Sequence, residues 1–224
     1  MIGLRIWSIG LLGTVAAVIA SYLWLDRPLA HLAHDAIAPF HLFDKLTLVP
    51  DAIVPIAVVA IAAIGLRGLT GKPLSRLQSV LLLCGLSLAA ADIVKIQLKY
   101  AFGRTWPETW IRNNPSFIRD NVYGFFPFHG GAGYDSFPSG HTTAVCTVMT
   151  VLWLCYPRYR ALYALAVAAV ALGLVGADFH FLSDVIAGAF LGTSVGWISV
   201  SLWEIAARRV RPDGETAAKT DRPT

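Results

Sequence analysis

With 224 residues, 56% of them hydrophobic and only 14% charged, the chain carries more apolar surface than a single soluble core buries, which excludes an ordinary soluble domain. Its net charge of +4 is not arranged as a basic stripe interleaved with aromatic residues, so we expect no nucleic-acid partner. A membrane crossing takes about 20 apolar residues, and the length therefore allows roughly six crossings with short connections.

Six apolar stretches follow one another along the chain, and they predict an all-α fold, a bundle of six transmembrane helices. They cover residues 6–25, 48–66, 77–94, 142–156, 161–177 and 182–203. The first exceeds the apolar core of a signal peptide, about 7–15 residues, so we expect an anchor. The fourth is short enough for a half-buried helix. We predict one membrane domain over residues 1–210 and a polar cytoplasmic tail over 211–224.

Two connections are predicted to lie at the outer face of the membrane. Residues 26–45 mix His31, His34, Asp35 and Asp44 with apolar residues, which indicates an amphipathic segment along the interface with solvated histidines. Residues 103–138, between the third and fourth helices, are rich in Trp, Phe, Asn, Pro and Gly. That composition favours an aromatic-rich extracytoplasmic cap loop.

The distribution of Lys and Arg predicts the orientation. Alternate connections carry eleven of these residues on one side and seven on the other, and the richer side includes both termini. Because positive charge is retained on the cytoplasmic side, we expect both termini to be cytoplasmic.

The last apolar stretch carries a packing signal. Gly188, Gly192 and Gly196 recur every four residues and lie on one face of a helix. We therefore expect another helix to pack closely against this face.

Residues 137–142 read Phe-Pro-Ser-Gly-His-Thr before an apolar run, which predicts a helix start with Ser139 as its N-cap. The free backbone N–H groups of such a start bind anions, and Gly140 lets an oxyanion come close. His141, in the first turn, is placed to give a proton to a departing oxygen. The alternative is an ordinary capped helix with an interfacial histidine.

His180 and Asp184 stand four residues apart, so on a helix they share one face. The carboxylate of Asp184 would then accept a hydrogen bond from one ring nitrogen and leave the other nitrogen of His180 as a nucleophile. The alternative is a structural pair.

Cations accompany these motifs. Lys95 and Lys99 share a helix face, and Arg104 follows in a Gly-Arg turn, an arrangement that suits phosphate oxygens. The alternative is interfacial cations whose charged groups reach toward water. A further alternative is a metal site with ligands from His129, His141, His180 and Asp184. The neighbouring cations would repel a divalent ion, so we predict no metal.

Together these motifs resemble those of the type 2 phosphatidic acid phosphatase superfamily, which includes bacterial lipid phosphatases, glucose-6-phosphatase and vanadium haloperoxidases. The resemblance covers residues 95–192, with Pro-Ser-Gly-His intact at 138–141 and His-x-x-x-Asp matched by His180 and Asp184. It implies a multi-pass protein of the bacterial inner membrane with a periplasmic or extracellular active site.

The resemblance also implies a mechanism without a metal or cofactor. His180 would attack phosphorus to form a phosphohistidine, oriented by Asp184, and His141 would protonate the leaving group. The hydroxyl of Ser139, the amide of Gly140 and the ammonium of Lys99 would hold the phosphate oxygens.

The sequence departs from the family pattern at two positions where the family carries arginine. The first family block is Lys-x6-Arg-Pro, and here Lys99 is followed by Trp106 in place of that arginine. The third block has arginine six residues before its histidine, and here Leu174 occupies that position. We expect Arg104 to substitute in binding phosphate, with Arg112 and Lys95 in reserve.

We therefore expect a metal-independent phosphatase that hydrolyses a lipid phosphomonoester or lipid diphosphate. Its expected substrates are phospholipids such as phosphatidate and phosphatidylglycerophosphate, lipid A, and polyprenyl phosphates or diphosphates. Two alternatives stay open: a lipid phosphotransferase, and a catalytically silent binding or scaffold protein, which Trp106 and Leu174 favour.

Overall fold

Among residues 3–38, 43–110 and 112–210, which the computed structural model describes, regular secondary structure is helical apart from isolated β-bridges. The predicted all-α class is therefore confirmed for these residues, while the predicted tail 211–224 lies outside them. The α-helices are α1 (Leu4–Ala20), α2 (Asp26–Leu32), α3 (Leu48–Leu69), α4 (Arg76–Phe102), α5 (Phe117–Asp120), α6 (Gly140–Cys155), α7 (Arg160–Gly176) and α8 (Leu182–Val210). Single π-helical turns occupy Ser21–Leu25 and Ala33–Ile37, and 3-10 turns occupy Asp44–Thr47, Ala132–Tyr134 and Pro157–Tyr159.

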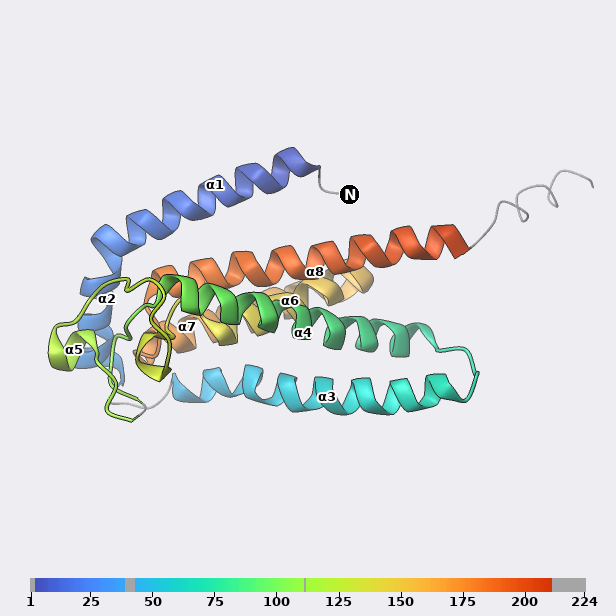
Figure 1. Ribbon diagram of the computed structural model, residues 1–224, viewed down its shortest axis with the longest axis horizontal. Coiled ribbons are helices and arrows are strands. Elements are labelled where there is room, and N and C mark those ends of the chain that lie inside the picture. Colours follow the sequence, from blue (N-terminus) through green and yellow to red (C-terminus); the bar gives the residue numbers. More distant parts are fainter. Residues whose placement is uncertain (1–2, 39–42, 111, 211–224) are drawn as a thin grey trace, which may run out of the picture.

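The long helices run side by side, and most of the irregular structure gathers at one end of the bundle (Figure 1). Five helical segments of the described chain are long and apolar enough to cross a membrane, and α6, with 16 residues, is apolar but shorter. Because α6 contacts α3, α4, α7 and α8, it occupies the centre of the bundle. The five segments are Leu4–Ile37, Asp44–Leu69, Arg76–Phe102, Pro157–Gly176 and Leu182–Arg209.

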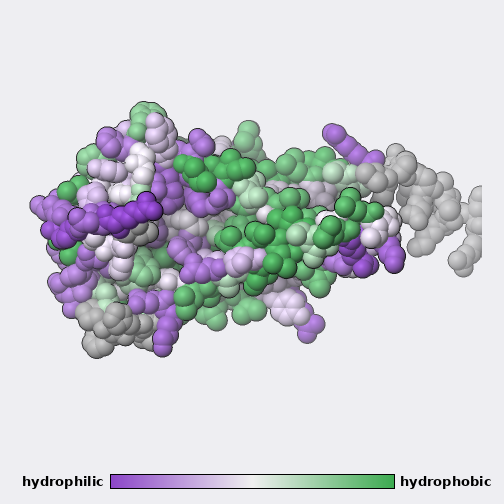
Figure 2. Space-filling model, turned by 60° about the horizontal axis from the view of Figure 1, so that its bottom comes forward, coloured by the Kyte–Doolittle hydropathy of each residue, from purple (hydrophilic) through white to green (hydrophobic). Residues whose placement is uncertain are grey.

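The surface is divided in the same way. Hydrophobic residues cover the middle of the bundle, and hydrophilic residues gather at the end that carries the segment between α4 and α6 (Figure 2). The turn between α3 and α4 and the end of α8 lie at the opposite end, and the start of α1 points toward that end (Figure 1). A surface of this kind suits a bundle whose sides face lipid and whose ends face water.

Helices α6 and α8 approach each other backbone to backbone through the glycines that the sequence predicts to be a packing face. A Cβ atom at Gly192 would stand 2.3 Å from the carbonyl oxygen of Thr143, and one at Gly188 would stand 2.6 Å from that of Ser139. Side chains would therefore separate the two helices. The close approach places the start of α6 beside the start of α8, where the candidate site lies.

A glycine also ends α4. Gly103 has a φ of 57°, and a Cβ atom there would lie 1.9 Å from the carbonyl oxygen of Phe126, so only glycine fits this helix end. Residues 103–139 then fold back over the helix ends, where Phe117 packs in one apolar cluster with Ala30 of α2 and Phe181.

The residues after α1 differ from the predicted interfacial segment. α2 turns across the end of the bundle (Figure 1), and Asp26 at its start is only 1% exposed because Arg104 binds its carboxylate. His31 is exposed as expected. His34 is exposed as well, and its Nδ1 also lies 3.0 Å from a carboxylate oxygen of Glu108.

Candidate active site

His180 and Asp184 contact each other at the start of α8. Nδ1 of His180 lies 3.4 Å from Oδ2 of Asp184, and the same oxygen accepts a hydrogen bond from the Ser136 hydroxyl at 2.6 Å. The backbone N–H of Phe181 donates to it as well, at 3.1 Å. His180 precedes α8 instead of lying on it, but the spacing of four residues still brings the two groups together. Since Nδ1 faces the carboxylate, the contact leaves Nε2 of His180 unused.

The backbone and the surroundings of His180 hold the imidazole in a defined state. The backbone N–H of His180 donates to the carbonyl of Leu174 at 3.1 Å, and the residue is only 4% exposed. Burial lowers the pKa of His180 below its usual value, although the hydrogen bond and the charge of Asp184 act in the opposite direction. The lowered pKa favours the neutral ring, which keeps a free lone pair.

Arg104 lies behind this pair, in the interior. Its guanidinium is completely buried, with Asp184 at 2.6 Å from one nitrogen and Asp26 at 2.6 Å from another. It also donates to the hydroxyl of Ser183, which in turn binds Asp26. Burial alone would lower the pKa of Arg104, but the two carboxylates raise it, so the cation persists.

This position differs from the phosphate-binding role that we expect for Arg104 from the sequence. The guanidinium does not line the cavity described below, and the ring of Phe181 covers one side of it, 4.4 Å from Cζ. The structure instead makes Arg104 the buried counter-ion of Asp184. Arg112, held in reserve, is exposed in the segment after α4 and does not line the cavity either.

The Pro-Ser-Gly-His motif starts α6 as predicted. The side chain of Ser139 is the N-cap and accepts a hydrogen bond from the backbone N–H of Thr142 at 3.4 Å. The backbone N–H of Ser139 donates to the carbonyl of Asp184 at 3.1 Å, which ties the starts of α6 and α8 together. Ser139 is completely buried and does not reach the cavity, whereas Gly140 and His141 line it.

A cavity of about 770 Å³ joins the catalytic candidates. Its polar end is formed by Lys95, Lys99, Gly140, His141 and His180. Asp51, Asp92 and Asn114 also line it, and an apolar part of the wall runs between α3 and α4, through residues that include Val54, Val58, Ile61, Leu88 and Ala89. One space therefore holds both histidines and continues into the apolar side of the bundle.

The polar end carries both signs of charge. The ammonium of Lys99 donates to the carbonyl of Asp135 and lies 5.6 Å from the ring centre of Trp106. Lys95 pairs with Asp92, and both line the cavity. Cations at this end suit an anionic group, and the carboxylate of Asp92 and the backbone carbonyl of Asp135 hold the two ammonium groups in place.

His141 has an acidic partner of its own. Its Nε2 lies 3.1 Å from Oδ1 of Asp51, at the start of α3, and both residues line the cavity. The side chains are partly exposed, at 37% for His141 and 59% for Asp51. His141 is therefore oriented by a carboxylate but stays open to solvent, as a group that exchanges protons must.

The two positions that depart from the family pattern hold neutral side chains. The ring centre of Trp106 lies 5.0 Å from that of His180, and its indole N–H donates to the carbonyl of Ala132 at 2.7 Å. Leu174 is completely buried in an apolar cluster of α6, α7 and α8. Neither position supplies a cation, and Trp106 instead gives His180 an aromatic wall.

Several polar residues of this site were not among those predicted, and they include Asp26, Asp51 and Ser136. Asp26 and Asp51 stand at the ends of apolar stretches, and such a placement is a usable signal because an unpaired charge at membrane depth is costly. Ser136 has no comparable signal, because only the folding of residues 103–139 over the bundle brings it to His180.

The site lies in a region with clear relatives. Residues 80–208 match the family model of the PAP2 superfamily. A lipid A 1-phosphatase of Rhizobium etli is 35% identical over 127 residues, which make up 54% of this chain and 50% of that protein, so the matched part spans half of that relative's length. A lipid A 1-phosphatase of Rhizobium johnstonii is 29% identical over 229 residues, covering 95% of this chain and 88% of that protein.

A solved structure has a similar fold. The transmembrane phosphatidylglycerolphosphate phosphatase of PAP2 type from Bacillus subtilis superimposes with a TM-score of 0.62 at 17% sequence identity. The match covers 89% of this chain and 96% of that chain. At this identity the likeness concerns the arrangement of the helices.

Proposed function

Because this chain belongs to the PAP2 superfamily, we propose that it is a membrane phosphatase that removes a phosphate group from a lipid phosphomonoester or diphosphate by way of a phosphohistidine. The predicted family membership is confirmed by the match over residues 80–208. The observation that carries the proposed activity is that His141 and His180, from two different helix ends, line one cavity with two lysines.

In the first step, Nε2 of His180 attacks phosphorus in line with the bond to the lipid oxygen. An N–P bond forms as the P–O bond breaks, and His141 gives its proton to the departing oxygen. Asp184 accepts the hydrogen bond of the other ring nitrogen, which keeps the lone pair on Nε2 and stabilises the positive charge that the ring gains.

In the second step, water hydrolyses the phosphohistidine. His141, now neutral, takes a proton from the water as its oxygen bonds to phosphorus and the N–P bond breaks. Inorganic phosphate leaves, and both imidazoles return to their starting protonation. Atoms and charges balance over the two steps, and we propose that no metal or cofactor takes part.

The groups around the polar end supply the charge stabilisation. The ammonium groups of Lys95 and Lys99 and the first backbone N–H groups of α6, at Gly140 and His141, would hold the oxygens around phosphorus. We assign Ser139 to ordering the first turn of α6, because its hydroxyl does not reach the cavity.

The apolar wall of the cavity favours a lipid substrate. From Asp51 to Ile61 the wall follows α3 for ten residues, about 15 Å at 1.5 Å per residue, which is enough to hold a substantial part of an acyl chain. Two relatives are lipid A 1-phosphatases, so lipid A is the first substrate that we propose. Phosphatidylglycerophosphate, phosphatidate and polyprenyl phosphates and diphosphates follow.

We also propose six crossings, with α6 as the short central one, and a site on the outer face of the bacterial inner membrane. The turn between α3 and α4 carries Lys72, and the end of α8 carries Arg208 and Arg209. These cations lie at the end opposite the site (Figure 1), so retention of positive charge on the cytoplasmic side directs the site to the periplasm.

The decisive experiment is phosphate release by the purified full-length protein from mixed micelles that contain lipid A. We expect wild-type protein and His129→Ala to release phosphate, because His129 does not line the cavity, and His180→Ala to release essentially none. Equal release by His180→Ala would refute the proposed chemistry. An acid-labile phosphate on His180 in rapidly quenched samples is the expected intermediate.

The same samples decide between hydrolysis and transfer. With a labelled phosphate group on the substrate, hydrolysis puts the label into inorganic phosphate, and transfer puts it into a second lipid. A silent binding protein would bind the lipid and release no label in either form.

A further inference from the structure

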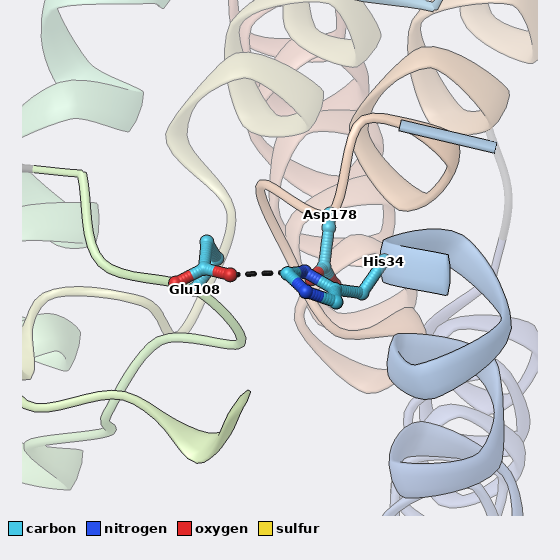
Figure 3. Close-up of side chains that lie close together, drawn as sticks. All are labelled: His34, Glu108 and Asp178. Atoms are coloured by element: carbon cyan, nitrogen blue, oxygen red, sulfur yellow. Dashed lines mark ion pairs between the residues drawn. The ribbon is translucent and has the colours of Figure 1, made fainter. Parts of the chain in front are cut away.

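A second cluster of ionisable side chains lies outside the cavity. His34 comes from the π-helical turn after α2, Glu108 from the segment after α4, and Asp178 from the turn between α7 and α8. Nδ1 of His34 lies 3.0 Å from Oε2 of Glu108 and 3.8 Å from Oδ2 of Asp178. The three side chains point toward one another from three separate elements (Figure 3), and their ligand atoms all lie within 4.8 Å of one another.

The carboxylate of Asp178 is the feature that calls for a ligand. Asp178 is only 2% exposed, and its Oδ2, the atom that faces His34, has no hydrogen-bond partner among the described residues. A buried carboxylate oxygen without a partner is costly, and the second carboxylate, Glu108, increases the local negative charge. Arg119 is attracted electrostatically to Glu108, but its guanidinium donates its hydrogen bonds to Asp120 and Asn113 instead.

We propose that His34, Glu108 and Asp178 bind a divalent cation of the zinc class. One imidazole nitrogen and two carboxylate oxygens form a set that suits zinc and neighbouring transition metals, whereas calcium and magnesium prefer oxygen ligands alone. Ligand atoms around a tetrahedral zinc ion at bond lengths of about 2.1 Å lie about 3.4 Å apart, and the separations of 3.0 Å and 3.8 Å from Nδ1 of His34 fall on either side of that value.

The proposed ion is not part of the phosphoryl-transfer chemistry. None of its three ligands lines the cavity that holds His141 and His180. The ion would link the turn after α2, the segment after α4 and the turn between α7 and α8. Glu108 follows Trp106 by two residues, and the ring of Trp106 packs on His180.

A second aromatic contact crosses the same junction. Asp178 precedes Phe179, whose ring meets that of Trp110 edge to face with centres 4.4 Å apart. An ion that joins Glu108 to Asp178 therefore holds both tryptophans of the segment against the turn that carries His180. Metal binding would thus order the aromatic side of the cavity.

The test is metal binding by the full-length protein in detergent. After treatment with a chelator and equilibration with Zn²⁺, we expect one zinc per chain by mass spectrometry of the metal content. At a hundredfold excess over Kd, we expect a rise in Tm of about 5 °C. We expect no rise with Mg²⁺ or Ca²⁺. Absence of a stoichiometric zinc in the wild-type protein would overturn the proposal.

Three variants and one control make the result specific. His34→Ala, Glu108→Gln and Asp178→Asn should each lose the zinc and the rise in Tm, and His31→Ala, one helical turn before His34, should keep both. Asp178→Asn should be at least as stable as the wild type without metal, because it replaces a buried carboxyl oxygen that has no hydrogen-bond partner among the described residues. Zinc binding by these variants equal to that of the wild type would contradict the proposal. A lower metal-free Tm for Asp178→Asn would contradict it as well, because it would indicate a plain ion pair between Asp178 and His34.

Phosphate release measured on the same samples separates this inference from the proposed activity. If the protein releases phosphate but binds no zinc, only the proposed metal site is refuted. If it binds zinc through these ligands but releases no phosphate, only the proposed phosphatase activity is refuted.

Discussion

A guanidinium nitrogen of Arg104 lies 2.6 Å from Oδ1 of Asp184, and both side chains are completely buried. The other carboxylate oxygen of Asp184 faces His180. Arg104 and His180 therefore hold the same carboxylate from two sides. We therefore propose that Arg104, two residues before Trp106, acts through Asp184 and positions the imidazole of His180 without touching a substrate.

Replacing Arg104 should damage stability more than any single change at the surface. In Arg104→Met, Asp26 and Asp184 would be left buried without their counter-ion, a loss that typically costs about 3–5 kcal/mol. We expect a clear fall in Tm and loss of phosphate release. Arg119→Ala breaks an exposed pair with Asp120 and should leave both nearly unchanged.

The conservative variant separates positioning from phosphate binding. Arg104→Lys keeps the charge but cannot reach both carboxylates with separate nitrogens, so we expect a lowered Tm and a lowered kcat with little change in KM. A variant with the Tm of the wild type and a strongly raised KM would show instead that Arg104 contacts the phosphate group.

Asp51 should act on the reaction through His141. Removing the carboxylate in Asp51→Asn takes away the partner that lies 3.1 Å from Nε2, so the imidazole is less well oriented toward the leaving oxygen. We expect kcat to fall about tenfold, equivalent to about 1.4 kcal/mol, with KM nearly constant. Steady-state phosphate release at several substrate concentrations measures the two constants. Partial recovery in Asp51→Glu would support orientation, and a kcat equal to that of the wild type in Asp51→Asn would exclude it.

Local patterns in the sequence predict some parts of this site well. Ser139 caps α6 because a serine before an apolar run satisfies free N–H groups, and this requires only neighbouring residues. The spacing of His180 and Asp184 likewise brings their side chains together within one turn. The glycines at 188, 192 and 196 predict a close helix contact for the same reason, because they repeat on one face.

Other parts depend on residues that are far apart in the chain. Asp26 and Arg104 are separated by 78 positions, and Arg104 and Asp184 by 80, so no spacing rule in a single sequence brings them together. The same limit explains why Arg104 was expected at the phosphate group: its charge is visible in the sequence, but its partner Asp26 is not. The contact between His34 and Glu108 likewise has no local signal, because it depends on how residues 103–139 fold over α2.

The glycine contact between α6 and α8 predicts a sharp asymmetry among glycine substitutions. In Gly192→Ala the new methyl group would stand 2.3 Å from the carbonyl oxygen of Thr143, so the helices must separate, and we expect a loss of about 1–3 kcal/mol. Gly65→Ala, on α3, meets nothing within 4 Å and should be neutral or slightly stabilising. Thermal unfolding of the two purified variants measures this difference, and equal Tm values would mean that α6 and α8 do not pack at these distances.

The apolar wall between α3 and α4 predicts a dependence on chain length that two neighbouring alanines can test. Ala89 lines the cavity, whereas Ala90, also exposed on α4, does not. An indole at position 89 would fill the space that we assign to an acyl chain, while one at position 90 would face away from the cavity. For Ala89→Trp we expect KM to rise about tenfold or more for a long-chain lipid phosphate and to change little for a short-chain analogue, since only the long chain reaches this wall. Ala90→Trp should behave like the wild type with both substrates. If Ala89→Trp impaired both substrates equally, the wall would be a structural surface, and the chain would have to leave the site by another route.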